Sequence, residues 1–117
     1  MYKPPVQELE WNEQLRNAAE GHSRDMADKN YFSHTSPDGK SFVDRINAAG
    51  YTGYRAVGEN IAAGYGTAAS VMQGWMSSPG HCNNIMNPVF REMGVGYAYN
   101  SGSQYKQYWT QNFGAKL

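Results

Sequence analysis

The sequence predicts a single α+β domain. Apolar residues recur at helical spacing in the first half of the chain, and they alternate with a period of two in the last third. A glycine-rich segment between these regions contains one short strand-like run. A chain of 117 residues can bury one modest hydrophobic core but not two. We therefore expect one domain over residues 1–117, with helices packed on a small antiparallel sheet.

Composition excludes several classes of protein. Ten basic and ten acidic side chains leave no net charge, so no basic stripe points to a nucleic-acid partner. No apolar run approaches the roughly 20 residues of a transmembrane helix, and no apolar signal-peptide region follows the first residues. Cys82 is the only cysteine, which excludes an internal disulfide.

The first helix is expected from an N-cap at Asn12 to about Lys29, with Asn30 as its stop. Its apolar stripe comprises Leu15, Ala18, Ala19, His22 and Met26. Because His22 lies on this stripe, we interpret it as a core histidine bonded to backbone, in preference to a ligand role.

A second, short helix begins after the turn-forming residues 31–39. Ser41 followed by Asp44 predicts a capping box, and Gly50 predicts the end of the helix. Its apolar face consists of Phe42, Ile46 and Ala49.

The glycine-rich segment 51–66 contains a strand-like core at Val57–Ile61. Thr67 is the expected N-cap of a third helix over 68–76, and another helical turn is expected up to Ile85.

A β-hairpin is predicted at the end of the chain, from alternation in residues 95–99 and 105–113 around a turn at 100–103. A hairpin alone is only marginally stable, so Val57–Ile61 is expected to supply a third strand.

Six sequence blocks occur in the order and spacing of a bacterial CAP domain, the superfamily of cysteine-rich secretory proteins, antigen 5 and pathogenesis-related proteins, also called SCP-like. The blocks are His22–Ala27, Tyr31–His34, Gly58–Ala62, Trp75–Met86, Met93–Gly96 and Tyr108–Gly114. The chain resembles this family from about Leu9 to Gly114. The resemblance implies a three-layer α-β-α sandwich and an extracellular or cell-envelope location. From the resemblance we expect that this chain lacks the family's first helix, and a face left bare by its loss would favour a homodimer.

The resemblance also implies a cavity with two histidines and two glutamates, which binds a divalent metal in some members. His34, Glu59 and His81 match three of these positions, and Ser78 stands at the fourth. Two imidazoles and a carboxylate suit zinc. We therefore hypothesise that His34 and His81 bind zinc or another divalent metal, with Glu59 as a third ligand or as a base that holds water. The alternative is that the three side chains only fix loops.

Catalysis is a second hypothesis for the same residues. Ser78 would be the nucleophile, His81 the base and Glu59 the group that orients the base. Against it, Ser78 lacks a Gly-x-Ser-x-Gly elbow, and Cys82, directly after His81, is expected to point away as inert packing. We therefore favour a binding module over an enzyme.

Binding of a small ligand is the third hypothesis. Six tyrosines gather in the glycine-rich segment and the hairpin: Tyr51, Tyr54, Tyr65, Tyr97, Tyr99 and Tyr105. We expect at least half of them in the core or on ordinary surface, and we take Tyr54, Tyr65 and the neighbouring Asn60 as candidate ligand contacts. Family members bind lipids or glycans in several cases, so the resemblance implies a lipid or glycan ligand here.

Overall fold

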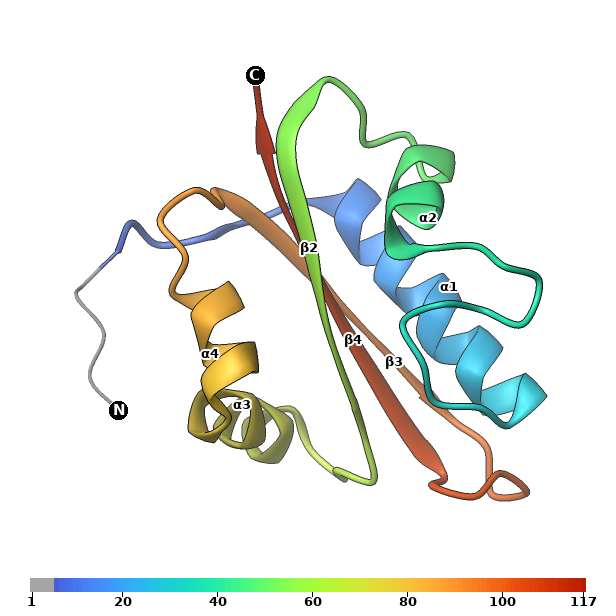
Figure 1. Cartoon of the computed structure of the whole chain (residues 1–117). Helices are drawn as coiled ribbons and strands as arrows, with labels where there is room; N and C mark the ends of the chain where they lie inside the picture. The colour runs from blue at the N-terminus through green and yellow to red at the C-terminus, as the bar shows by residue number, and fades with distance from the viewer. Residues whose placement is uncertain (1–5) are drawn as a thin grey trace.

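The computed structural model describes residues 6–117, which form four helices around a four-stranded sheet (Figure 1). The sheet has the strand order β1-β3-β4-β2. Its strands are β1 (Glu10–Trp11), β2 (Tyr54–Ala63), β3 (Glu92–Tyr99) and β4 (Gln107–Lys116). The helices are α1 (Glu13–Lys29), α2 (Phe42–Ala48), α3 (Ala68–Ser77) and α4 (Pro79–Ile85).

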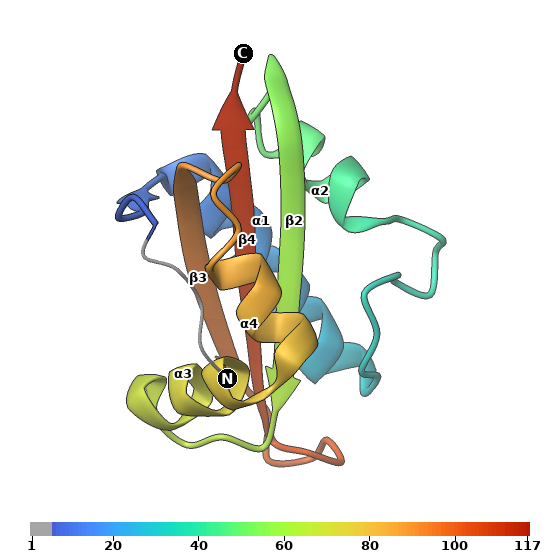
Figure 2. The same cartoon turned by 60° about the vertical axis from the view of Figure 1, so that its left-hand side comes forward.

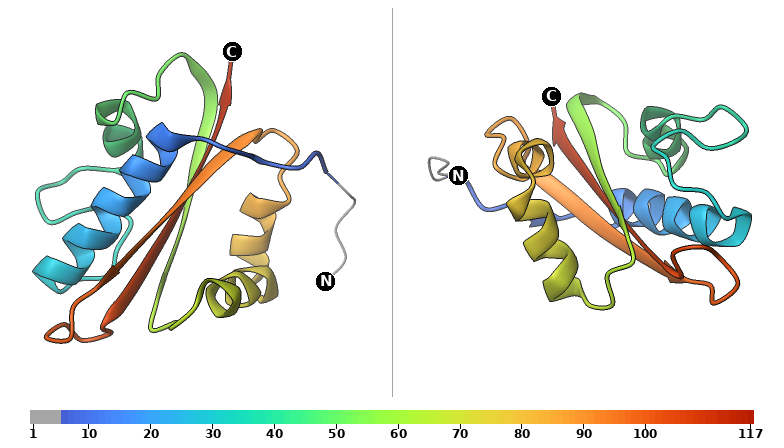
Figure 3. Two further views of the ribbon diagram at one scale, coloured as in Figure 1. Left: turned by 180° about the vertical axis from the view of Figure 1, so that it is seen from behind. Right: turned by 60° about the horizontal axis from the view of Figure 1, so that its bottom comes forward.

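The elements form three layers, as predicted. Helices α1 and α2 lie on one face of the sheet, and α3 and α4 lie on the other (Figures 1 and 2). The view from behind shows the same order of layers (Figure 3). None of the helices within residues 6–117 is long and apolar enough to cross a membrane.

The predicted antiparallel sheet is confirmed for β2, β3 and β4, and the structure adds a parallel edge strand that the sequence did not predict. Strand β1 pairs in parallel with β3, through Glu10 with Glu92 and Trp11 with Met93. A strand of two residues is too short to show an alternating pattern. Its pairing depends on a strand about eighty residues away, so no local signal predicts it. Strand β4 runs antiparallel to both β2 and β3, as expected.

The local capping signals are confirmed. The Asn12 side chain accepts a hydrogen bond from the Leu15 amide, and Asn30 ends α1 in the left-handed conformation. Ser41 and Asp44 form both bonds of a capping box, and Thr67 caps α3 through the Ser70 amide. Each signal acts within a few residues, so the helix starts were readable from the sequence.

Helix α1 packs directly on the backbone of β3. A Cβ atom added to Gly94 would overlap the backbone of Arg16, and one added to Gly96 would overlap the backbone of Glu20. The two glycines therefore allow the close approach of helix and strand that brings α1 over the sheet.

Strand β2 is an edge of the sheet and is longer than the predicted Val57–Ile61 core. Along it, Glu59 pairs with Asn112 and Asn60 pairs with Gln111 of β4. Since neighbouring residues of a strand face opposite sides, β2 presents Glu59 to the α1 and α2 layer and Asn60 to the α3 and α4 layer.

Candidate functional site

A buried carboxylate lies at the centre of the predicted histidine and glutamate cavity. The Glu59 side chain is 0% exposed and meets Arg45 of α2, whose Nη2 lies 3.0 Å from Oε1 and 2.8 Å from Oε2. With the Asn112 amide oriented so that both of its atoms are bonded, its nitrogen donates to Glu59 Oε2 (2.9 Å) and its oxygen accepts from the Ala19 amide. The guanidinium therefore balances the buried negative charge, and the two donors fix the position of the carboxylate.

His34 reaches the same carboxylate from the loop between α1 and α2. Its Nδ1 lies 2.9 Å from Glu59 Oε1, while its side chain is 51% exposed. Because an ionised carboxylate only accepts hydrogen bonds, Nδ1 carries the proton. Glu59 and Arg45 therefore fix the orientation of the His34 ring and leave its Nε2 atom for other contacts.

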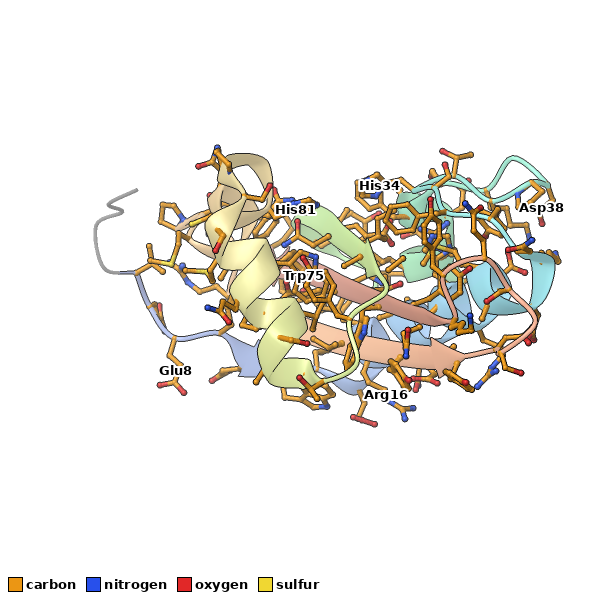
Figure 4. All side chains as sticks on the ribbon, turned by 90° about the horizontal axis from the view of Figure 1, so that it is seen from below. Glu8, Arg16, His34, Asp38, Trp75 and His81 are labelled. Atoms are coloured by element: carbon orange, nitrogen blue, oxygen red, sulfur yellow. The ribbon has the colours of Figure 1, made fainter. Side chains whose placement is uncertain are left out.

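His81 is held by a different partner. Its Nδ1 lies 2.9 Å from the Oγ of Ser78, which precedes α4 and makes no capping bond to that helix. Burial and the neighbouring His34 imidazole both lower the pKa of His81. Both effects favour the neutral form of the His81 imidazole. Figure 4 shows His81 on the same side of the molecule as His34.

The hydrogen bonds do not assemble the hypothesised catalytic triad. Ser78 and His81 are paired, but the described partners of the Glu59 carboxylate are Arg45, His34 and Asn112. The orienting role assigned to Glu59 is therefore not filled for His81. Cys82 is buried as expected.

His22 is confirmed as a core histidine. It is fully buried, and its Nε2 lies 2.8 Å from the backbone oxygen of Ser33. Burial lowers its pKa, the neighbouring Glu59 partly opposes this, and Arg45 adds to the lowering.

The residues around Glu59 do not fit the divalent metal that the resemblance implies. Among the described residues, no group of three or more His, Cys, Asp or Glu side chains is placed to hold a metal ion. Both oxygens of Glu59 already bind the Arg45 guanidinium, whose positive charge would repel a second cation. Metal binding by His34, Glu59 and His81 stays a prediction, and this geometry does not support it.

An open groove of about 320 Å³ lies beside His81. Phe32 and Tyr105 contribute aromatic rings that meet edge to face with centroids 5.9 Å apart, and Tyr65 and Trp75 contribute two more. The remaining lining residues are Ile61, Ala62, Ala63, Gly74, Ser78 and His81. The groove is therefore mostly apolar and aromatic, with one polar end at Ser78 and His81.

Of the candidate ligand contacts, Tyr65 lines this groove and the other two lie elsewhere. The Tyr54 hydroxyl donates to Asn47 Oδ1 (2.8 Å), and its ring stacks on Tyr51. The buried Asn60 side chain donates to the backbone oxygen of His81 and accepts from Asn84, which ties α4 to β2.

Sequence reasoning missed Arg45 and two of the four groove aromatics, Phe32 and Trp75. Arg45 follows Phe42 by three residues and precedes Ala49 by four, so it lies on the apolar stripe of α2. A charged residue on a buried stripe is the signal that indicates a buried partner. Phe32 and Trp75 come from two distant segments, and no local pattern links them to each other or to the tyrosines.

The chain belongs to the CAP family. The family model described as "CAP: Cysteine-rich secretory protein family" matches residues 3–113. The resemblance seen in the six sequence blocks is confirmed.

Two proteins of Bacillus subtilis (strain 168) are similar to this chain over 95% of its length. The uncharacterized protein YkwD is 44% identical, and the uncharacterized membrane protein YlbC is 36% identical. The chain spans only 41% and 30% of these relatives, respectively, so it corresponds to one part of each.

Solved structures show the same fold. An extracellular protein containing an SCP domain from Bacillus anthracis str. Ames is 40% identical, with a TM-score of 0.81 over 95% of this chain and 35% of that chain. An outer surface protein of Borrelia burgdorferi has a TM-score of 0.83 at 19% identity, over 96% of this chain and 80% of that chain. The second likeness concerns the fold alone.

Proposed function

We propose that this CAP domain is an extracellular ligand-binding module whose ligand occupies the aromatic groove. The observation that carries the proposal is the groove itself, with four aromatic side chains around a polar end formed by Ser78 and His81. The related Bacillus anthracis protein, described as extracellular, supports the location.

The chemistry of the groove limits its ligand. Aromatic faces bind apolar chains or the flat faces of sugar rings, and the hydroxyl and imidazole at the end bind a polar group. The ligand therefore combines an apolar or ring face with a polar group, which lipids, glycans and peptides with apolar side chains all do. The volume lies at the lower end of the range of about 300–1,000 Å³ for ligand pockets, so it holds a short portion of a ligand.

Binding is better supported than turnover. The hydrogen bond between Ser78 and His81 is the contact that favours a hydrolase. In a Ser-His-Asp triad a third group holds the imidazole in its catalytic tautomer. Glu59, the residue hypothesised for that role, binds Arg45 instead. We therefore propose a metal-independent binding site that catalyses no hydrolysis.

Titration calorimetry with octyl glucoside and with chitotriose, a short alkyl glycoside and a short glycan, tests the groove. Tyr105→Ala removes a groove ring that is 44% exposed, and Tyr99→Ala removes a ring that is 49% exposed and does not line the groove. We expect Tyr105→Ala to lower the affinity for the probe by about tenfold, which corresponds to about 1.4 kcal/mol. Tyr99→Ala should leave this affinity unchanged. Equal effects of the two variants would contradict binding in the groove.

A further inference from the structure

The outer edge of β2 forms part of the groove. Strand β2 is the last strand of the sheet, so only one of its edges is paired, with β4. Its residues Ile61, Ala62 and Ala63 line the groove next to the aromatic walls. An unpaired strand edge presents backbone donors and acceptors at regular intervals.

The ladder shows which residues of β2 face outward. The Gly64 amide donates to the Gln107 oxygen (2.9 Å), so these two residues form a hydrogen-bonded pair. Such pairs occur at every second residue of an antiparallel ladder, so Ala62 points its backbone at β4 while Ile61 and Ala63 point theirs away from it.

A side-chain contact agrees with this assignment. Trp75 of α3 donates its Nε1 hydrogen to the backbone oxygen of Ile61 (3.2 Å). This oxygen would be less accessible to the indole if it pointed at β4 and bonded to that strand. The Trp75 bond occupies the outward carbonyl of Ile61. It leaves the other outward backbone groups of Ile61 and Ala63 available.

Three backbone groups remain along the groove. They are the amide of Ile61 and both the amide and the carbonyl of Ala63, for which the structure shows no partner within residues 6–117. Ile61 and Ala63 are two residues apart, so their groups repeat at about 7 Å along the strand. This spacing and alternation match the backbone of another extended chain.

We propose that the groove binds a short extended peptide, which adds to β2 as a further strand at Ile61 and Ala63. The proposal rests on the proposed function, namely that the groove is a ligand site. An acyl chain has no groups to pair with the outward amides and would bury them unpaired, which is costly. Sugar hydroxyls do not alternate in register with a strand, whereas a peptide backbone does.

The walls predict which peptide side chains are accepted. Successive side chains of an added strand point to opposite sides. The peptide therefore directs alternate side chains toward Phe32 with Tyr105 and toward Tyr65 with Trp75, which favours apolar residues at both. The volume of about 320 Å³ accommodates a few residues only.

The test uses a positional library of acetylated, amidated hexapeptides, followed by titration of the tightest binder. Ala63→Pro removes the outward amide, and proline is tolerated at an edge where that amide is not part of the ladder. We expect the circular dichroism spectrum of Ala63→Pro to show a retained fold, and its affinity for the hexapeptide to fall by tenfold or more. Ala63→Ser keeps the amide and serves as the matched control, with binding unchanged. Ala62→Pro removes a ladder bond and is expected to destabilise the domain.

A second measurement uses the wild-type protein. Methylating single backbone nitrogens of the hexapeptide should abolish binding only at the amide that donates to the Ala63 carbonyl. Peptides methylated at the other positions should still bind. Binding that tolerates methylation everywhere would overturn the strand-addition proposal, whatever the stability of Ala63→Pro.

The outcomes separate the two proposals. If octyl glucoside or chitotriose binds in the groove but no hexapeptide does, strand addition is wrong and the groove remains a ligand site. If a hexapeptide binds equally to Ala63→Pro and Ala63→Ser, the peptide is held by side chains alone and strand addition is again wrong. If no probe binds, both proposals fail.

Discussion

Replacing Arg45 with methionine tests the ion pair that holds the site together. The change keeps an unbranched side chain but leaves the carboxylate of Glu59, whose side chain is 0% exposed, without its cation. Removing one partner of a buried pair costs about 3–5 kcal/mol, because the remaining charge stays buried. Arg45 is itself only 12% exposed, so solvent screens the pair little.

Thermal unfolding followed by tryptophan fluorescence measures this loss. For a domain of this size we expect Arg45→Met to lower the melting temperature by about 12–20 °C. The matched control is Arg24→Met, because Arg24 makes a surface pair with Asp28 at 3.8 Å and is 52% exposed. Arg24→Met is expected to lower the free energy of unfolding by less than about 0.5 kcal/mol.

The double variant Arg45→Met with Glu59→Gln identifies the cause of the loss. With no buried charge left, we expect it to recover a large part of the stability that Arg45→Met alone loses. An Arg45→Met loss no greater than that of Arg24→Met would refute the buried ion pair.

Two further changes test the fold around the site. Burial lowers the pKa of His22, so as pH falls through about 6.5 the unfolded chain gains this proton before the folded one, and stability falls by up to about 1.4 kcal/mol per pH unit. Urea unfolding measures the free energy of unfolding from pH 8 to pH 5, which should decline less steeply with falling pH in His22→Gln than in the wild type. The same pH dependence in both proteins would contradict the lowered pKa of His22. Gly96→Ala adds a Cβ that overlaps the Glu20 backbone, and we expect a loss of about 1–3 kcal/mol or more because α1 must shift. Gly102→Ala, where the added atom meets only a side-chain oxygen at 3.4 Å, is its control in a thermal unfolding experiment.

The helices were predictable because their signals are local. Asn12, Ser41 and Thr67 each cap a helix through an amide three residues further along the chain, so the sequence within one turn decides the start. The hairpin was predictable for a related reason, since alternation directly encodes which side chains face the core. Strand β1 has neither signal, because its two residues are ordered by pairing with β3.

The site was only partly predictable because it depends on long-range contacts. The convergence of His34 on Glu59 was foreseen from the motifs, and the bond between them agrees with it. The partner that determines the chemistry of Glu59, Arg45, comes from a short helix that the sequence defines mainly by its cap and its apolar residues. The prediction of Glu59 as a metal ligand did not include the Arg45 guanidinium, which binds both of its oxygens.

The most direct test of the account is an NMR titration of labelled wild-type protein in the presence of EDTA. The probes are octyl glucoside, chitotriose and the tightest hexapeptide. The account predicts saturable shifts at the amides of Ala63, Tyr65, Trp75 and Tyr105 with metal removed, since neither the groove nor the Arg45–Glu59 pair needs a metal ion. Shifts that occur only after zinc is added in excess of the EDTA, and that disappear in His34→Ala and His81→Ala, would contradict it and restore the metal site.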